Sequence, residues 1–582
     1  MKKINNKYKL RFTIPLLLLV TVGFWACKKS FLETTPYGRY GDAQLYNAKG
    51  IDALLVGAYG MLDGESQFKY GENWATPSTN WVYGDIASDD AYKGTDANDQ
   101  PNMTAVEIYN WLPSNNYFYA RWISIYDGIA RANDVIKVLA LTKEANPAEV
   151  SVEFEKNVTA EARFIRGWQH FEAKRMWGNI PYVDETATEN PGNGAADVWA
   201  KIEADFQAAY DNLPGTQSQL GRVNKWAAGA YLAKAKLYQG DYSGALAIFN
   251  IVKAQGVTPK GDSYKLLDAY WQNFDPRYEN GPESVFAIQF AAQGSQEGDG
   301  SRGYGLAFPY GGDFGCCGFL QPSQNLVNAY KTDANGLPLL NTFNDVDVKS
   351  DEGVKSADPY TIGTENMDPR VDWSVGRRSV PFWDWGPHPG QNWIRDQGYA
   401  GPYSPKKHIY SSADENGFNG TGWNNVTAKN YGAMRYADML LMMAECEVEV
   451  GSLDVARGYV NEVRLRAGKE ESKVVGSPAK YLIKTYDAAW TDKAVARQAV
   501  RFERRLELAM EGHRFFDLVR YDQNPATPTE AETTLNAFIT KEKEKRTYLK
   551  AANTFAAKNK VYPIPERAIV LSNGKITQNT GY

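Results

Sequence analysis

The 582-residue chain has few histidines and cysteines, the residues that most often bind metal ions or act as nucleophiles and bases in enzymes. It contains four histidines and four cysteines, and none of them form a Cys-x-x-Cys pair or a His/Cys cluster with the spacing of a zinc site. A Gly-x-Ser-x-Gly nucleophile motif, a His-Glu-x-x-His motif and a phosphate-binding glycine loop are also missing. We therefore expect no metal, no cofactor and no catalytic centre built on these motifs.

Basic clusters are absent beyond the N-terminus. The chain carries 64 Lys and Arg against 69 Asp and Glu, a formal net charge of −5. Proteins that bind nucleic acids neutralise phosphates with grouped Lys and Arg side chains. The charge pattern therefore excludes nucleic acid as an expected partner.

The N-terminus carries a short apolar run after a positive start. The positive residues are Lys2, Lys3, Lys7, Lys9 and Arg11, and the apolar run spans 14–26. A membrane helix needs about 20 apolar residues, so the run is typical of a secretory signal peptide. It ends at Ala26-Cys27, which resembles a bacterial lipoprotein signal whose cysteine becomes the lipidated first residue. The alternative is a plain signal peptide with an incidental cysteine. We interpret 1–26 as the signal and 27–40 as a tether.

A helical hairpin at 222–254 is the unit around which the chain is organised. Small residues at its centre allow close helix packing, Gly240 suits a helix end, and Asp241 suits the start of the next helix. The segment 444–463 aligns on 233–252 without a gap, with Gly451 on Gly240. Two such hairpins predict a tetratricopeptide-like scaffold, since one unit cannot bury its apolar face alone. Two unrelated amphipathic hairpins are the alternative.

Helical periodicity extends over much of the chain but fades in one long segment. The segment 256–429 is rich in Gly, Pro, Asn and aromatic residues, with its best strand at 283–290 and a short helix at 320–330. A structureless stretch of this length indicates a functional region. We predict a mainly α fold in which helical hairpins form a scaffold with a loop-rich insertion of a few short strands. Further helices are predicted at 42–62, 117–141, 153–177, 198–213, 434–467 and 492–521.

Aromatic residues are abundant, with 36 Tyr, 24 Phe and 16 Trp. Many lie in segments expected to be loops, where exposed rings can stack on the apolar faces of sugars at little entropic cost. Burial in the core is the alternative for each ring. The predicted ligand-binding residues are Trp74, Trp81, Tyr83, Tyr304, Phe308, Tyr310, Trp383 and Trp385. Nearby polar candidates are Asn80, Asp85, Arg302, Asp313 and Asp384.

Two acidic features raise other possibilities. A glycosidase needs two carboxylates about 5 to 10 Å apart, and Asp384 and Asp372 are the most suggestive acids because each adjoins a tryptophan. We favour a hydrogen-bonding role for them. The acidic segment 85–90 allows calcium, but it lacks the spacing of an EF-hand. The charged run at 503–520 is interpreted as ion pairs on one helix surface and between helices.

The two remaining sets of cysteines are assigned from their surroundings. Cys446 lies on the second hairpin and is expected to be a small core residue. Cys316 and Cys317 are adjacent, so they are either two reduced thiols in a loop or a disulfide between neighbouring residues. We favour the reduced form.

Several motifs resemble the SusD-like (RagB/SusD) outer-membrane lipoproteins of Bacteroidetes. They occur in order from the leader to the last residue, so the resemblance covers the whole chain. At the start, Cys27 is followed by FLE at 31–33 and by Pro36. The other matching segments are 161–168 (EARFIRGW), 176–183 (MWGNIPYV), 435–445 (RYADMLLMMAE), 461–468 (NEVRLRAG), 504–518 (RRLELAMEGHRFFDL), 562–565 (YPIP) and 578–582 (QNTGY).

The resemblance implies a single α-rich domain at 41–582 whose loop-rich part, 256–429, binds the ligand. It also implies a non-enzymatic protein, anchored through lipid on Cys27 to the outside of the outer membrane. Such a protein captures oligosaccharides and delivers them to a SusC-like TonB-dependent transporter. Peptide binding, as in RagB-like members, is the alternative, and a glycoside hydrolase is the less favoured one.

Overall fold

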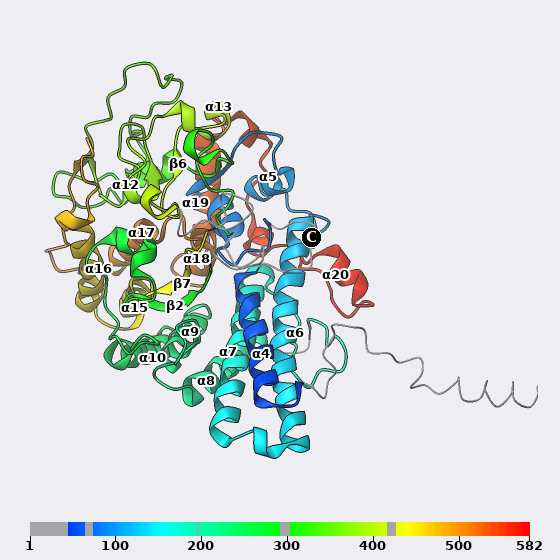
Figure 1. Cartoon of the computed structure of the whole chain (residues 1–582). Helices are drawn as coiled ribbons and strands as arrows, with labels where there is room; N and C mark the ends of the chain where they lie inside the picture. Colours follow the sequence, from blue (N-terminus) through cyan, green and yellow to red (C-terminus); the bar gives the residue numbers. More distant parts are fainter. Residues whose placement is uncertain (1–44, 65–73, 195–196, 292–302, 416–426) are drawn as a thin grey trace, which may run out of the picture.

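The computed structural model describes residues 45–64, 74–194, 197–291, 303–415 and 427–582 (Figure 1). Helices dominate, as predicted from the sequence. The longer ones are α4 (Ala48–Tyr59), α6 (Asn116–Ala145), α7 (Val152–Trp177), α8 (Val198–Asn212), α9 (Lys225–Leu237), α10 (Tyr242–Gln255), α15 (Tyr436–Val450), α16 (Leu453–Gly468), α17 (Lys493–Leu508), α18 (Arg514–Tyr521) and α19 (Glu530–Glu542). Shorter ones are α5 (Pro101–Glu107), α11 (Gln324–Ala329), α12 (Val371–Ser374), α13 (Gln397–Ala400) and α20 (Glu566–Leu571). In these ranges, no helix has the length and apolarity needed to cross a bilayer.

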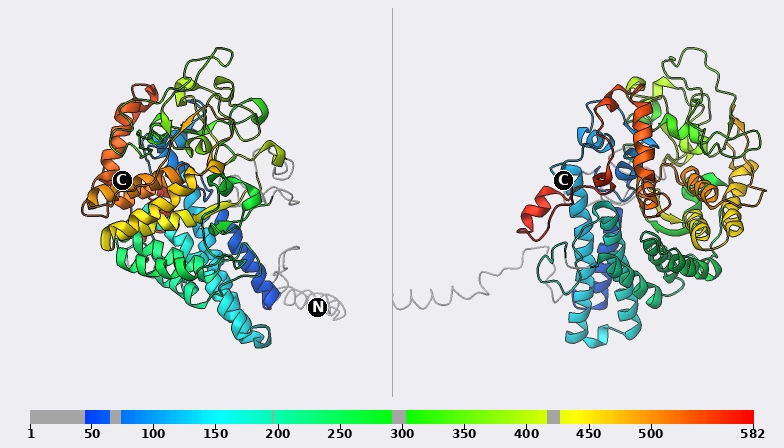
Figure 2. Two further views of the ribbon diagram at one scale, coloured as in Figure 1. Left: turned by 90° about the vertical axis from the view of Figure 1, so that its left-hand side faces the viewer. Right: turned by 180° about the vertical axis from the view of Figure 1, so that it is seen from behind.

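The two hairpins have the local signals that the sequence indicates. Asp241 accepts a hydrogen bond from the backbone N–H of Gly244 at 2.8 Å and so caps α10. Gly240 has a φ of +75°, a conformation that costs glycine little. Ser452 caps α16 by accepting from the N–H of Val455. Helix α10 packs on α15, so both hairpins belong to one stack of helices (Figure 2). The predicted shared scaffold is confirmed.

Strands are short, and every sheet within the described ranges has two strands. The strands are β1 (Ala91–Gly94), β2 (Ser284–Ile288), β3 (Phe319–Pro322), β4 (Asn366–Met367), β5 (Val375–Gly376), β6 (Ser404–Pro405), β7 (Tyr431–Arg435) and β8 (Lys480–Tyr481). The antiparallel pair β2–β7 closes the loop-rich segment and leads directly into α15, with Ile288 opposite Tyr431. Phe286 of β2 packs edge-on against Phe164 of α7, 5.1 Å between ring centroids. The strand predicted at 283–290 is therefore the link between the loops and the helical core.

The helix predicted over 492–521 is wrong in one respect, because the chain turns between α17 and α18. Met510 and Gly512 have positive φ angles of 67° and 77° there. The charged run is also buried rather than on a surface. Arg504 of α17 pairs with Asp517 of α18 at 2.7 Å, and Arg435 pairs with Glu507 at 3.0 Å. Buried charges are tolerated when they are paired in this way, so the run joins helices inside the core.

The cysteines differ from expectation at one site. Cys316 and Cys317 form a disulfide, so the preference for reduced thiols is wrong. Cys446 is a buried free thiol in α15, as predicted. The C-terminal segment at 562–565 is extended, and Tyr562 is fully buried against Trp111, with ring centroids 4.2 Å apart.

Candidate functional site

The first loop, at 74–94, carries aromatic residues that are mostly buried. Trp81 and Tyr83 are 2% and 1% exposed, so the prediction that they offer faces to a ligand is wrong. The indole N–H of Trp81 donates to the carbonyl oxygen of Gly303 at 2.5 Å, and the hydroxyl of Thr79 donates to the same oxygen at 3.2 Å. These bonds position the residue before Tyr304. Trp74 is half-buried against the core.

The glycine-rich loop at 303–318 has aromatic residues both in the core and at the surface. Phe308 is 1% exposed in a cluster with Phe314, so its predicted contact with a ligand is wrong. Tyr310 is half-buried, and the guanidinium of Arg395 lies 5.3 Å from its ring centroid. Arg395 in turn pairs with Asp99 at 2.8 Å. Tyr310 is therefore a partly exposed ring at a charged edge.

Trp383 and Trp385 are both half-buried and flank the exposed Asp384. The indole N–H of Trp383 donates to the carbonyl of Lys406 at 3.3 Å, and that of Trp385 to the carbonyl of Tyr410 at 2.9 Å. Each N–H is thus fixed from the protein side. A ring held in this way loses little further entropy when a ligand packs on its exposed part.

Two further rings extend this surface, and the sequence analysis did not select them. Trp271 is half-buried with its ring centroid 6.4 Å from that of Trp383. Tyr278, which is 37% exposed, lies 5.6 Å from Trp271. Their position in a Pro- and Asn-rich segment was the available signal. We call Trp271, Tyr278, Trp383 and Trp385 the aromatic surface.

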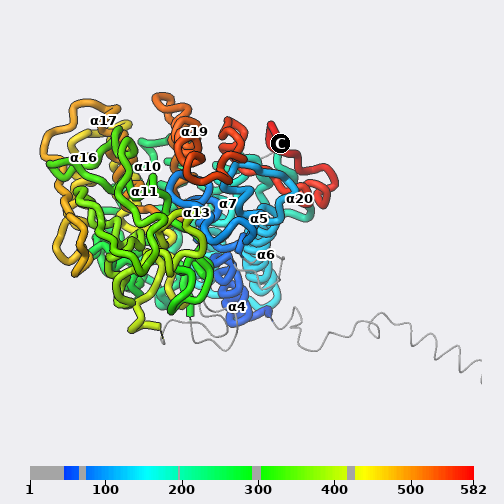
Figure 3. Tube along the Cα trace, turned by 90° about the horizontal axis from the view of Figure 1, so that it is seen from above, coloured from blue at the N-terminus to red at the C-terminus, as the bar shows by residue number. Residues whose placement is uncertain are grey.

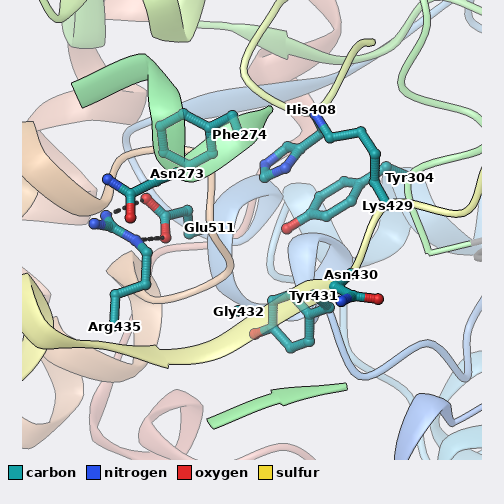
Figure 4. A pocket seen from close by; sticks show the side chains of 10 residues that line it. All are labelled: Asn273, Phe274, Tyr304, His408, Lys429, Asn430, Tyr431, Gly432, Arg435 and Glu511. Carbon is teal, nitrogen blue, oxygen red and sulfur yellow. Dashed lines mark hydrogen bonds and ion pairs between the residues drawn. The ribbon is translucent and has the colours of Figure 1, made fainter. Parts of the chain in front are cut away.

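Figure 4 shows the lining of a small cavity of about 40 Å³. Lys429 connects the cavity with the aromatic surface, because its ammonium lies 5.9 Å from the Trp383 ring and its side chain lines the cavity. A water needs about 10 to 15 Å³, so the cavity takes a few waters or one protruding hydroxyl group. The lining residues are Asn273, Phe274, Tyr304, His408, Lys429, Asn430, Tyr431, Gly432, Arg435 and Glu511.

Tyr304 reaches the cavity stacked on His408. Its hydroxyl points into the space (Figure 4) and is buried, with no hydrogen-bond partner among the described residues. An unpaired buried hydroxyl costs about 1 to 3 kcal/mol. A water or a ligand hydroxyl in the cavity would remove that cost, so Tyr304 remains a candidate binding residue.

The charges around the cavity are balanced. Burial by itself would raise the pKa of Glu511, but Arg435 and Lys407 hold it well below its usual range. Arg435 binds both oxygens of Glu511, at 2.9 and 2.8 Å. Burial lowers the pKa of His408 to about 3, so its ring is neutral, and its Nε2–H donates to the Met510 carbonyl at 2.5 Å. These groups therefore offer a neutral, polar wall.

Two ionisable groups near Asn430, those of Lys429 and Glu279, have pKa values shifted toward neutral pH. Burial lowers the pKa of Lys429 to about 8, although Glu279 opposes the shift. Burial raises the pKa of Glu279 to about 7, against the hydrogen bond that its Oε1 accepts from the Asn430 N–H at 2.7 Å. Both groups change charge near neutral pH.

The acids considered for hydrolysis are occupied by structural bonds. Asp384 accepts from the backbone N–H groups of Ser412 and Ala413 at 2.5 and 3.0 Å. Burial opposes its ionisation, but these donors lower the pKa of Asp384, and a proton donor needs the opposite shift. Asp372 is fully buried and pairs with Arg377 at 2.7 Å.

The other polar candidates are also placed. Asn80 and Asp85 are buried, and Asp85 accepts from the Gly512 N–H at 2.9 Å. Asp313 is exposed, and Arg302 lies outside the described residues. Within the described ranges, no group of three or more His, Cys, Asp or Glu is arranged to hold a metal ion.

The loops that carry the site come together from distant parts of the chain. Strand β1 of the first loop pairs with β3 of the insertion, with Ala91 opposite Pro322. Viewed from above, the blue segment that contains α5 lies against the green segments of the insertion (Figure 3). The first loop and the insertion are therefore joined by a two-stranded sheet.

Comparisons with known proteins agree with this architecture. The model of the SusD family matches residues 282–582, and a model described as "Starch-binding associating with outer membrane" matches 30–237. The SusD-like protein P2 of Formosa agariphila is 27% identical over 542 residues, covering 88% of this chain and 90% of the relative.

Solved structures share the fold. A SusD superfamily protein from Bacteroides vulgatus is 20% identical with a TM-score of 0.66, covering 92% of this chain and all of the other. Surface glycan-binding protein A from Bacteroides thetaiotaomicron, in complex with laminarihexaose, is 20% identical with a TM-score of 0.63, covering 91% and 99%. The model of the SusD family matches more than half of this chain, and the chain therefore belongs to the SusD family.

Proposed function

We propose that this protein is a non-catalytic glycan-binding protein that captures oligosaccharides at the cell surface. The observation that carries the proposal is the aromatic surface, in which Trp383 and Trp385 are fixed through their indole N–H groups and remain partly exposed. Sugar rings pack on such faces, and polar groups beside them select hydroxyl groups. Tyr304 and Asn430 supply such groups at the adjacent cavity.

The ligand is neutral or weakly charged in this proposal. Arg435 and Glu511 neutralise each other inside the cavity, and His408 is uncharged. The names of related proteins support the same ligand class, since one structural neighbour was solved with laminarihexaose and one matching family model is described as starch-binding.

The cellular role follows the family resemblance. The protein is anchored by lipid on Cys27, which lies outside the described residues, and it faces outward on the outer membrane. It passes its ligand to a SusC-like TonB-dependent transporter. The chain divides into a signal at 1–26, a tether at 27–40 and one binding domain at 41–582, whose loop-rich part at 256–429 holds the aromatic surface.

Affinity electrophoresis of the lipid-free protein through gels that contain laminarin or starch tests the proposal. We expect one polysaccharide to retard wild-type protein while the chain length of that polysaccharide stays constant. The double variant W383A/W385A should stay folded and migrate freely, although its melting temperature falls because both rings are half-buried. A fall in chain length would favour a hydrolase instead. Retention by neither polysaccharide, together with binding to peptides in a peptide pull-down, would favour the RagB-like alternative.

A further inference from the structure

A second and larger cavity, of about 300 Å³, is lined by none of the residues of the aromatic surface. It opens between the C-terminal end of α4, the turn at 219–222 and strand β2. Its volume falls at the lower end of the range for small-molecule sites, about 300 to 1,000 Å³. The lining residues are Val56, Tyr59, Gly60, Leu62, Asp63, Gln219, Gly221, Arg222, Phe286, Ala287, Ile288 and Gln289.

The lining combines apolar groups with neutralised polar groups. Val56, Leu62 and Ile288 supply apolar contacts. The guanidinium of Arg222 pairs with Asp52 at 2.6 Å and with Glu161 at 3.4 Å. Its charge is thus compensated, and an anionic ligand would find no net positive charge there. A neutral polyol with an apolar face fits this lining best.

Two polar side chains in the lining are held in place before any ligand binds. The hydroxyl of Tyr59 donates to Glu161 at 2.7 Å and accepts from the Val223 N–H at 3.0 Å. The amide oxygen of Gln219 accepts from Arg222 at 2.6 Å. Pre-organised groups of this kind reduce the entropy that binding costs.

A hydrogen bond between two side-chain amides connects the larger cavity with the cavity that Tyr304 lines. The side chain of Asn430, which lines the Tyr304 cavity, donates to the oxygen of Gln289 at 2.9 Å. Gln289 lines the larger cavity, and both residues adjoin the paired strands β2 and β7. Neighbouring strands are about 4.8 Å apart, so the two cavities are lined by adjacent backbones of one sheet.

We propose that the larger cavity is a second carbohydrate subsite, which takes one or two neutral hexose units of the oligosaccharide held at the aromatic surface. The inference depends on the proposed function, because it assumes a glycan ligand. It adds that affinity increases with chain length until both subsites are filled.

Blocking the cavity with a side chain on its rim tests the subsite. Val56 is 53% exposed, so V56W fills the mouth without disturbing the core. Ala53 is exposed on the same helix but does not line the cavity, which makes A53W the matched control. Isothermal titration calorimetry would use laminaribiose, laminarihexaose, maltose and maltohexaose as probes.

We expect V56W to weaken hexasaccharide binding about tenfold, equivalent to about 1.4 kcal/mol, while A53W binds as wild type and both variants melt as wild type. Hexasaccharide affinity unchanged in V56W would overturn the subsite. If W383A/W385A nevertheless abolishes that binding, the proposed function survives alone. If wild-type protein binds none of the four probes, the subsite as proposed is wrong.

A second measurement detects the ligand in the cavity directly. In protein with ¹³C-labelled methyl groups, laminarihexaose or maltohexaose should shift the resonances of Val56, Leu62 and Ile288. The methyl groups of Val570, which is exposed on α20, serve as the control. Saturating hexasaccharide that shifts none of the three cavity residues would also overturn the subsite.

Discussion

Tyr304 and His408 stack face to face, with ring centroids 3.5 Å apart and planes at 5° to each other. The two residues come from different loops of the insertion, and Trp81 holds the backbone next to Tyr304 from a third loop. The stack places the Tyr304 hydroxyl in the small cavity while one face of its ring is covered. Tyr304 therefore contributes a polar contact rather than a stacking surface.

Replacing Tyr304 with Phe separates these roles. Y304F keeps the stack on His408 and removes a buried hydroxyl without a partner among the described residues. We expect an equal or slightly higher melting temperature and a loss of glycan affinity of about 0.5 to 1.5 kcal/mol. Calorimetric titration and thermal unfolding provide the two values. An unchanged affinity would mean that the hydroxyl contacts water and no ligand.

Tryptophan substitutions distinguish the surface from the core. W385A should lower stability less than W81A, because Trp385 is half-buried, and should weaken glycan binding by about 2 kcal/mol, as truncation of an aromatic residue at a binding site does. W81A should lower the free energy of unfolding by about 3 to 5 kcal/mol, because Trp81 is 2% exposed. Chemical denaturation and glycan affinity would be measured for both. Comparable stability losses without any binding defect in W385A would refute the aromatic surface.

Acid should destabilise the folded protein by protonating Glu507, which pairs with buried arginines. Burial alone would raise its pKa, but Arg466, Arg435 and Arg370 lower the pKa of Glu507 to about 2. An unfolded glutamate has a pKa of about 4.3. The stabilisation is thus fully present above about pH 4.3 and is lost as the pH falls toward 2.

The variant E507Q isolates this contribution. At pH 7 it should be about 3 to 5 kcal/mol less stable than wild type, since it leaves one positive charge of the buried network uncompensated, although Arg466, Arg435 and Arg370 keep their other carboxylate partners. The difference should shrink as the pH falls from 4.5 to 3, as measured by urea unfolding. A difference that is constant over this range would contradict the assigned pKa direction.

Reduction of the Cys316–Cys317 disulfide should affect global stability only weakly. The bridge joins adjacent residues, and a loop this short restricts the unfolded chain by about 1 kcal/mol in the chain-entropy description. We expect a phosphine reductant followed by alkylation to add two labels by mass spectrometry and to lower the melting temperature slightly. Two labels without reduction would show that the thiols are free.

Lipid attachment predicts the behaviour of a Cys27 variant. C27S should either release soluble protein or leave the precursor uncleaved, because the cysteine that carries the lipid is gone. Detergent partitioning and the mass of the processed chain provide the measurement. A variant that is processed and partitions into detergent like wild type would contradict the lipoprotein assignment.

Local signals in the sequence were sufficient for the helices. Side-chain spacing, the cap at Asp241 and the positive φ of Gly240 depend on neighbours a few residues away, so both hairpins could be predicted. The break between α17 and α18 was missed because the apolar and charged periodicity continues across it. The strand at 283–290 was found, but its partner β7 could not be read from the sequence.

The site depended on tertiary structure. Trp81 and Trp385 are the same residue type in segments of similar composition, yet distant segments bury the first and leave the second half-buried. Trp271 meets Trp383 only through the folding of the insertion. Exposure is set by which non-local surfaces pack together, and this information is not in any short window of sequence. The sequence by itself therefore determined the family, the helices and the abundance of aromatic residues, while the tertiary structure decided which rings a ligand can reach.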